Sequence, residues 1–513
     1  MGERSFEDIL DLIGHFGPAQ ALILFFSCSL EATCALIVYY FMFEGGQPGF
    51  YCVHSNSSSA NGALNLTLDE CPPTGKTCSN ITYLDEFTSV VTEWDMICGD
   101  AYIPRLLTSL LFVGLLVGAF LGGQLADIYG RKWTLLAAWA LMMFVQATSA
   151  VAPSWPVYAA VRAVAGVSGG AVATIATVLA VEFVGPKWRP LLSIRFGWRV
   201  GNFIIIGLAY LLPQWRLLVV ASGLFMFPVF ALAIFFMPES SRWLIQKGRY
   251  EEASKVLTYV ARLNKRAPPD MKLIMELGEE KVNNNYTFLD LFRTKRYAAQ
   301  TLTLMFGWFV SNTTSYGLQA QISSALVGDI YLNSLIAGSM NVVTVIIGAL
   351  MMKWMPRRIS YAVFMIYPIG AMAAILTLDL TGYMVGREML RTMLALSSFA
   401  VLACSWQVDI LYSTEAYPTL VRNIATGAGN IAARVGGILA PQIGLLGVFH
   451  PSLPYAIIGA QAIAASILMF VVMPETKGRP LPEGLPPRSW GKGSKTCRYK
   501  DTSKEAQIQE TKY

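Results

Sequence analysis

The sequence predicts an all-α membrane protein with twelve transmembrane helices arranged in two six-helix halves. Hydrophobic residues make up 54% of the 513 residues and charged residues only 14%, whereas a typical soluble domain has about 25% charged residues. About twelve apolar runs approach the roughly 20 residues that are needed to cross a bilayer. Features of the first half of the chain also recur about 230 residues later, which indicates two similar halves.

The apolar runs are justified in order by their length and by the polar segments between them. They lie near 19–43, 104–126, 133–151, 155–181, 198–213, 217–237, 299–320, 331–355, 360–379, 392–412, 423–446 and 453–473. The fifth and seventh runs are weak, because Gly or polar residues interrupt them. The N-terminus is acidic and the first run is long, so we expect an uncleaved span rather than a signal peptide.

Two long insertions divide the chain into five predicted parts. These are a cytoplasmic N-terminus (1–18), an N-terminal six-helix half (19–237) that includes an extracellular loop (44–103), a cytoplasmic interdomain loop with amphipathic helices (238–298), a C-terminal six-helix half (299–473) and a cytoplasmic tail (474–513).

The first insertion combines cysteines with glycosylation sequons. Four cysteines indicate two disulfides whose pairing stays open, with reduced structural cysteines as the alternative. Three sequons indicate a glycosylated segment outside the cytoplasm. The residues are Cys52, Cys71, Cys78, Cys98, Asn56, Asn65 and Asn80. Cys28, Cys34 and Cys404 lie in apolar runs, and we expect them to be inert packing residues.

The cations between the apolar runs predict the orientation. If the first insertion is outside, the basic segments that fall inside agree with the positive-inside rule. They include Arg131, Lys132, Lys187, Arg189, Arg357, Arg358, Arg422, Lys492, Lys495 and Arg498. We therefore expect a multi-pass protein of the plasma membrane with both termini in the cytoplasm.

Charged residues at the helix ends follow the internal repeat. Arg131-Lys132 recurs as Arg357-Arg358, and the pair Glu182 and Arg189 recurs with the same spacing as Glu415 and Arg422. Ion pairs at such ends can hold the two halves of a transporter together and release them when substrate binds. The residues predicted to act in this gating are Asp127, Arg131, Glu182, Arg189, Glu415 and Arg422. The alternative is static anchoring of the helix ends by snorkelling side chains.

Several motifs resemble one transporter family. Residues 123–132, Gly-Gln-Leu-Ala-Asp-Ile-Tyr-Gly-Arg-Lys, resemble the signature loop of the major facilitator superfamily. Residues 238–244, 415–423 and 474–478 resemble the organic cation, anion and carnitine transporter family (solute carrier family 22-like), as does the cysteine-bearing loop after the first span. The resemblance covers nearly the whole chain. It implies the major facilitator fold and gradient-driven transport of small organic ions by alternating access.

Charged residues inside the apolar runs are predicted to bind the substrate, because ionisable groups in a membrane are functional candidates by default. Arg434 matches the position where, by resemblance, anion and carnitine transporters carry Arg and cation transporters carry Asp. Asp409 departs from the family pattern and could hold an ammonium group or neutralise Arg434. Glu31 could take a proton or a cation, or pair with a neighbouring helix. Arg199 could contribute as well or snorkel at a membrane edge.

Aromatic and amide side chains complete the predicted site. Trp308, Tyr316 and Trp406 match or adjoin aromatic positions that, by resemblance, pack against flat organic ions, and Gln407 adds a hydrogen-bonding group. Rings bind cations through their faces and also cover apolar bodies. The alternative for each ring is helix packing, and the same holds for buried Arg162 and its neighbouring glycines.

The sequence predicts a transporter of an organic anion or a carnitine-like zwitterion, with an organic cation transporter or a non-transporting receptor as alternatives. No nucleophile–base set points to an enzyme, and no cofactor is expected. The three histidines are far apart, so no metal site is expected. The expected partners are a small organic ion and the lipid bilayer but no nucleic acid; a coupling ion or counter-substrate stays open.

Overall fold

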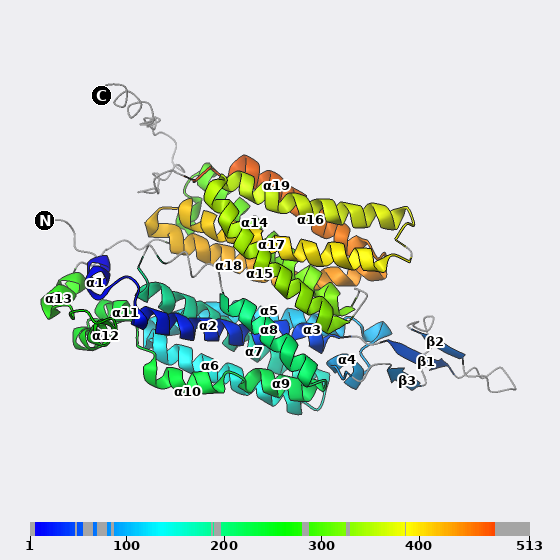
Figure 1. Cartoon of the computed structure of the whole chain (residues 1–513), viewed down its shortest axis with the longest axis horizontal. Helices are drawn as coiled ribbons and strands as arrows, with labels where there is room; N and C mark the ends of the chain where they lie inside the picture. Colours follow the sequence, from blue (N-terminus) through cyan, green and yellow to red (C-terminus); the bar gives the residue numbers. More distant parts are fainter. Residues whose placement is uncertain are drawn as a thin grey trace, which may run out of the picture.

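The structure of the chain, a computed structural model, forms two helical bundles that lie side by side (Figure 1). It describes residues 6–46, 49–54, 65–68, 80–83, 87–185, 188, 196–279, 287–324, 329–384 and 386–477. The first bundle is built from the first half of the chain and the second bundle from the second half, as the repeat predicts.

The first bundle holds six spans. Its elements are α2 (Pro18–Tyr39), α3 (Phe41–Glu44), α5 (Ile103–Tyr129), α6 (Arg131–Thr148), η2 (Ser149–Val151), α7 (Trp155–Phe183), α8 (Phe196–Leu211), α9 (Trp215–Leu224) and α10 (Phe227–Phe236). The sixth predicted run is divided into α9 and α10. Pro228 stands in the first turn of α10, where a residue without a backbone N–H fits and an uninterrupted helix would be broken.

The second bundle holds the other six spans. Its elements are α14 (Lys295–Ser324), α15 (Ile330–Trp354), α16 (Arg357–Leu380), α17 (Glu388–Glu415), α18 (Thr419–Ile443), η5 (Gly444–Val448) and α19 (Leu453–Val472). Among the described residues these elements make twelve membrane-crossing segments, so the predicted fold class is confirmed, with boundaries that shift by a few residues.

Length and apolar composition alone would select nine spans among the described residues. The three remaining segments are α8, which is shorter, and α14 and α18, which carry more polar residues. Each of these three contributes side chains to the cavity described below. A helix that presents polar groups to a cavity must lose apolar character on that face.

The segment between α3 and α5 carries a small antiparallel sheet that the sequence analysis did not predict. Its strands are β1 (Phe50–His54), β2 (Asn65–Leu68) and β3 (Asn80–Tyr83), in the order β2-β1-β3, followed by α4 (Val90–Glu93) and η1 (Cys98–Asp100). Tyr51 pairs with Leu68, and Phe50 pairs with Tyr83. We call this side of the molecule the sheet end.

Some of the predicted features of this segment can be placed. Cys98 is disulfide-bonded. The predicted sequons at Asn65 and Asn80 begin β2 and β3, and Cys52 lies in β1. The structure describes the backbone of these three residues but not their side chains. Asn56, Cys71 and Cys78 lie outside the described residues, as does Arg189 at the other side of the molecule. Cys28, Cys34 and Cys404 are free thiols.

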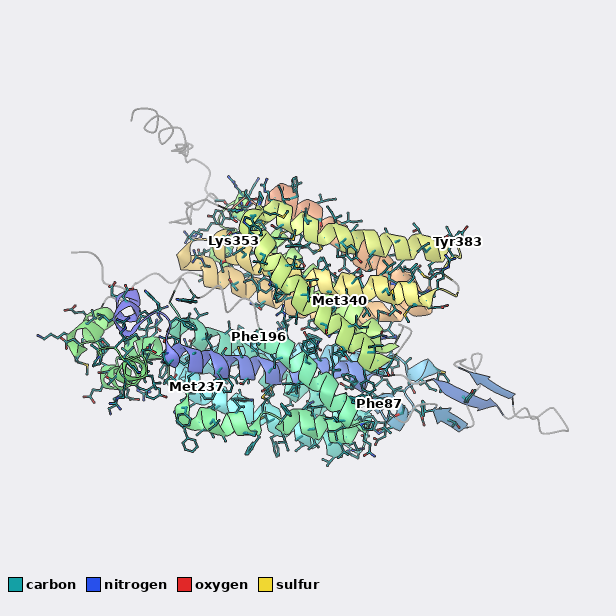
Figure 2. The ribbon with its side chains drawn as sticks, in the orientation of Figure 1. Phe87, Phe196, Met237, Met340, Lys353 and Tyr383 are labelled. Atoms are coloured by element: carbon teal, nitrogen blue, oxygen red, sulfur yellow. The ribbon has the colours of Figure 1, made fainter. Side chains whose placement is uncertain are left out.

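The opposite side, which we call the terminal end, carries α1 (Phe6–Ile13), α11 (Ser241–Gln246), α12 (Tyr250–Leu263), α13 (Met271–Glu279) and η4 (Phe288–Phe292). Asn264, just after α12, accepts a hydrogen bond from the backbone N–H of Ala19 at 3.0 Å and donates to Gln20 at 2.8 Å. The interdomain segment thereby caps the first turn of α2. Figure 2 shows Met237 and Lys353 toward this end, and Phe87 and Tyr383 toward the sheet end.

Glycines set the closest helix contact of the first bundle. A Cβ built on Gly118 of α5 would lie 1.8 Å from the carbonyl oxygen of Val167 in α7, and one built on Gly170 would lie 2.1 Å from the carbonyl oxygen of Leu115. Backbones can approach this closely only where the side chain is a hydrogen atom. The backbones of α5 and α7 are therefore in direct contact at these positions.

The two halves contact each other through α5 with α18 and through α8 with α15. The Ser109 hydroxyl donates to the carbonyl of Ile438 at 2.7 Å, and Gln442 donates to Ser109 at 2.9 Å. Phe112 packs edge-on against Tyr316, with ring centroids 4.7 Å apart. These contacts lie from the middle of the bundles to the sheet end, where α5 begins and α18 ends.

Candidate transport site

A cavity of about 130 Å³ lies between the two halves at the middle of the helices. The first half contributes Tyr39 from α2, and Trp198 and Arg199 from α8. The second half contributes the remaining lining residues from α14, α15, α17 and α18. These are Ser311, Asn312, Ser315, Tyr316, Gln319, Asn341, Phe399, Ala403, Trp406, Gln407, Asn430, Ala433 and Arg434.

Arg199 reaches the cavity because of how α8 packs. Gly197 and Gly201 lie on the face of α8 that contacts α2: a Cβ on Gly197 would be 2.2 Å from the carbonyl oxygen of Cys28, and one on Gly201 would be 2.5 Å from that of Ala32. Residues two positions from either glycine point the opposite way on a helix. Arg199 is such a residue, and it therefore faces the cavity rather than a membrane edge.

Arg434 reaches the same cavity from the other half. It stands one turn after Asn430 on α18, and both side chains line the cavity. Two guanidinium groups, one from each half, therefore face one space. Among the residues that the structure describes, no Asp or Glu lines this cavity. Its lining is rich in amides, hydroxyls and aromatic rings and carries a positive formal charge.

The predicted aromatic and amide residues divide into two groups. Tyr316, Trp406 and Gln407 line the cavity. Trp308 is 2% exposed, does not line it, and donates from its indole nitrogen to the hydroxyl of Ser413 at 3.1 Å. The ring of Trp308 lies edge-on against Trp406 with centroids 4.7 Å apart. Trp308 thus holds Trp406 in position from behind.

The two predicted acidic residues do not line the cavity. Asp409 is fully buried between helices of the second half and accepts a hydrogen bond from Ser311 at 2.6 Å. Among the described residues no cation forms an ion pair with this carboxylate, so the structure does not show the ion pair with Arg434 that was one of the two alternatives for Asp409. Glu31 is 9% exposed on α2, where Gly197 of α8 packs against it.

Most of the cavity lining was not predicted from the sequence. The sequence analysis did not single out the lining residues Tyr39, Trp198, Asn312, Asn341 and Phe399. The available signal was the presence of amides inside apolar runs, because a buried amide needs hydrogen-bond partners or a wet cavity.

At the terminal end, the predicted gating residues of the first half that the structure describes form one cluster. Arg131 pairs with Asp127, and its other guanidinium nitrogen lies 3.6 Å from Glu182. Glu239 accepts from the backbone N–H groups of Arg131 and Lys132 at 2.8 and 3.0 Å, which places a carboxylate at the N-terminus of α6. This position favours negative charge.

The second half repeats the cluster. Arg357 makes two hydrogen bonds to Glu415, at 3.2 and 3.1 Å, and Thr476 donates to Glu415 at 2.6 Å. Glu475 accepts from the backbone N–H groups of Arg357 and Arg358 at 2.8 and 3.2 Å. Each of these pairs joins helices of the same half. The sequence analysis used residues 238–244 and 474–478 only as family motifs and did not predict that Glu239 and Glu475 cap helices.

The Glu475 cap makes stability at the terminal end depend on pH. Burial alone would raise the pKa of Glu475, but the backbone N–H groups of residues 357, 358, 476 and 477 that donate to it lower this pKa below its ordinary value. A carboxylate whose pKa is lower in the folded than in the unfolded state stabilises the fold at a pH above its unfolded-state pKa, which is about 4.3 for Glu. This stabilisation is lost as the pH falls through the folded-state pKa. We expect Glu475→Gln to lower the thermal unfolding temperature at pH 7 and to lower it less as the pH falls below about 4.3.

Thermal unfolding of purified protein between pH 7 and about pH 3 measures this difference, because the predicted loss falls below the unfolded-state pKa. Gln246→Ala, at an exposed position at the end of α11, removes no ionisable group and is the control; its difference from the unchanged protein should not depend on pH. A gap between Glu475→Gln and the unchanged protein that stays constant over the whole pH range would contradict the prediction.

Comparisons with known proteins agree with this architecture. A family model described as sugar (and other) transporter matches residues 76–484. The chain is 30% identical to organic anion transporter 3 of Oryctolagus cuniculus, over 94% of this chain and 93% of that protein. It is 29% identical to the organic cation transporter protein of Drosophila melanogaster, over 94% of each, and 27% identical to solute carrier family 22 member 4 of Mus musculus, over 94% of each.

Solved structures show the same fold. The inward open conformation of the xylose transporter XylE from E. coli matches with a TM-score of 0.61 at 15% identity, covering 89% of this chain and 98% of that one. A partially occluded inward open conformation of XylE matches with a TM-score of 0.59 at 17% identity, covering 90% and 100%. The fold is therefore that of the major facilitator superfamily.

Fold, central cavity and relatives together define a multi-pass membrane transporter rather than an enzyme. The chain belongs to the organic cation, anion and carnitine transporter family, solute carrier family 22, within the sugar (and other) transporters of the major facilitator superfamily. It is an organic ion transporter.

Proposed function

We propose that this protein carries small organic anions across the plasma membrane by alternating access. The observation that supports the proposal is the charge of the central cavity. Arg199 and Arg434 line it from opposite halves, and among the described residues no acidic side chain lines it. A guanidinium group binds a carboxylate, sulfonate or sulfate through paired, charge-assisted hydrogen bonds.

The placement of the two arginines supports a coupling between binding and closure. When the halves approach each other around the cavity, two like charges come closer together in a medium of low dielectric constant. An anion between them offsets this repulsion, so it binds the closed cavity more tightly than the open one. A ligand can shift a conformational equilibrium only through such a difference in affinity.

The aromatic lining supports a substrate with a flat or apolar body. The aromatic side chains of Tyr316 and Trp406 line the cavity, and Trp198 and Phe399 add apolar surface. The same rings could hold the ammonium group of a carnitine-like zwitterion whose carboxylate contacts an arginine. A plain cation would meet two arginines without a lining carboxylate, so it is the least favoured substrate.

The terminal end is proposed to face the cytoplasm. Arg131, Lys132, Lys353, Arg357 and Arg358 lie at this end, as the positive-inside rule requires. The contacts between the halves lie toward the sheet end, so this conformation is closed on the proposed outer side. The predicted gating residues Asp127, Arg131, Glu182 and Glu415 pair within their own halves. We propose that these pairs keep each half rigid while the halves pivot, and that Arg422 has the same role.

Uptake by cells that express the protein tests the proposal. The probes are labelled benzenesulfonate, urate, carnitine and tetraethylammonium. We expect uptake of the anions, and Arg434→Ala should lower it by about 10-fold or more, because a hydrogen bond to a charged group contributes about 1.5–3 kcal/mol. Arg434→Asp should move the preference toward tetraethylammonium.

Arg266→Ala removes an exposed cation of the interdomain segment and should leave uptake unchanged. Surface labelling checks that each variant reaches the membrane. Uptake of tetraethylammonium alone by the unchanged protein, or anion uptake that is insensitive to Arg434→Ala, would overturn the proposal. Uptake of none of the probes would favour a receptor that kept the fold.

A further inference from the structure

Asp409 is a buried carboxylate that the anion site does not use directly. It is fully buried on α17, and its Oδ2 accepts a hydrogen bond from the Ser311 hydroxyl of α14 at 2.6 Å. Among the described residues Oδ1 has no hydrogen-bond partner; it faces Gly307, where a built Cβ would lie 2.9 Å from it. A buried carboxylate with one neutral donor is costly in its charged form.

Among the described residues, the surroundings of Asp409 provide no compensating cation. From α14 it meets Gly307 and Ser311, and the phenol of Tyr361 on α16 interacts with it electrostatically. From α19, Met469 packs beside Gly307. In the part of the chain that the structure describes, no Lys, Arg or His forms an ion pair with Asp409.

Ser311 connects this carboxylate to the cavity. The Ser311 side chain lines the same cavity as Arg199 and Arg434, and its hydroxyl lies 3.3 Å from the hydroxyl of Ser405. One hydroxyl group thus separates the cavity from Asp409. A hydroxyl can accept one proton while it donates another, which makes it a suitable relay between water and a carboxylate.

We propose that Asp409 is the proton-binding site of a proton–anion symport, loaded from the central cavity through Ser311. This inference rests on the proposed function and names the ion that is coupled to it. In the step, a hydronium ion in the cavity gives a proton to the Ser311 oxygen, and the original Ser311 proton moves to Asp409 Oδ2. The products are water, an unchanged serine and a neutral carboxyl group.

The linkage between proton and substrate follows from charge. An ionised Asp409 repels an anion in the adjacent cavity, whereas the neutral acid does not. Anion binding therefore favours protonation of Asp409, and protonation favours anion binding by the same factor. One proton and one monovalent anion then cross together, so the cycle of the unchanged protein moves no net charge.

Purified protein in liposomes tests the inference, with labelled benzenesulfonate as the probe because a sulfonate stays ionised over the pH range used. The liposomes contain pyranine to report internal pH, and valinomycin with potassium sets the membrane potential. We expect the unchanged protein to take up more benzenesulfonate when the outside is at pH 5.5 than at pH 7.5. Uptake should acidify the interior and should not respond to the potential.

Asp409→Asn should lose the pH stimulation and the internal acidification, and its benzenesulfonate uptake should become sensitive to an inside-positive potential. Loss of a merely structural carboxylate would lower uptake but leave its pH ratio and electroneutrality unchanged. Ser311→Ala keeps the carboxylate and removes its donor, so the pH at which uptake is half-stimulated should move upward. Glu388→Gln, an exposed carboxylate at the start of the same helix, is the matched control.

Electroneutral, acidifying uptake by Asp409→Asn would overturn the inference. If that variant does not fold, an unmoved pH midpoint in Ser311→Ala would overturn it instead. Benzenesulfonate uptake by the unchanged protein that is independent of pH and drives no proton movement would leave the anion carrier standing and reject the proton coupling. Absence of benzenesulfonate uptake at every pH would reject the anion carrier itself.

Discussion

Arg162→Met is expected to lower the free energy of unfolding by about 3–5 kcal/mol, the effect of breaking a buried ion pair. Arg162 is fully buried on α7 and lies 3.0 Å from Glu44, which is 1% exposed. The guanidinium also donates to Gln146 at 3.1 Å and to the carbonyl of Ile37 at 3.3 Å. The substitution leaves the Glu44 carboxylate buried without its cation.

Titration with sodium dodecyl sulfate in mixed micelles, followed by tryptophan fluorescence, measures this change. Arg249→Met disrupts an exposed pair with Glu252 and should cost no more than about 1 kcal/mol. The double substitution Arg162→Met with Glu44→Leu should recover much of the loss, because neither charge is then left alone. If Arg162→Met and Arg249→Met had equal effects, the network would carry no special stability.

Gly118→Ala is the second change with a large expected effect, a loss of at least about 3 kcal/mol, at the upper end of overpacking costs. The added methyl group would lie 1.8 Å from a backbone carbonyl oxygen of α7, which cannot move aside as a side chain can. The α5–α7 pair would have to separate along its length. We expect a lower thermal unfolding temperature and a smaller monodisperse peak in size-exclusion chromatography.

Gly123→Ala is a matched control on the same helix, because a Cβ built there meets nothing within 4 Å. Alanine is also the better helix former by about 1 kcal/mol, so this variant should be as stable as the unchanged protein or more so. A Gly118→Ala variant as stable as Gly123→Ala would show that α5 and α7 can separate without loss.

The helices were predictable because the bilayer imposes one length on every span. The predicted run 155–181 became Trp155–Phe183, and the run 453–473 became Leu453–Val472. The sheet in the first insertion was not predicted. Its strands have only four or five residues each, and the sequence analysis of this segment considered only its cysteines and sequons. The division between α9 and α10 depends on Pro228, and counting apolar residues along a run does not reveal where a proline divides the helix.

The cavity was only partly predictable because the rotation of each helix is set by its neighbours. On α17, Trp406 and Gln407 face the cavity, whereas Asp409, two positions beyond Gln407, faces the interior of the second half. On α14, Tyr316 lines the cavity and Trp308, two turns earlier, packs on Gly429 of α18. A helix that is buried on all sides has no polar face in its sequence, so the sequence does not show which of its residues face the cavity.

The polar character of α14 and α18 has a consequence for biosynthesis. An arginine near the centre of a helix adds about 2.5–3.5 kcal/mol to the free energy of insertion through the translocon, and Arg434 occupies such a position in α18. α14 carries buried hydroxyl and amide groups from Ser311 to Thr314 and packs directly against α18. Neither segment is a good independent substrate for the translocon, so each must enter the lipid alongside helices made earlier. A nascent chain released before α18 emerges would leave the polar flank of α14 facing acyl chains, a signal for quality control.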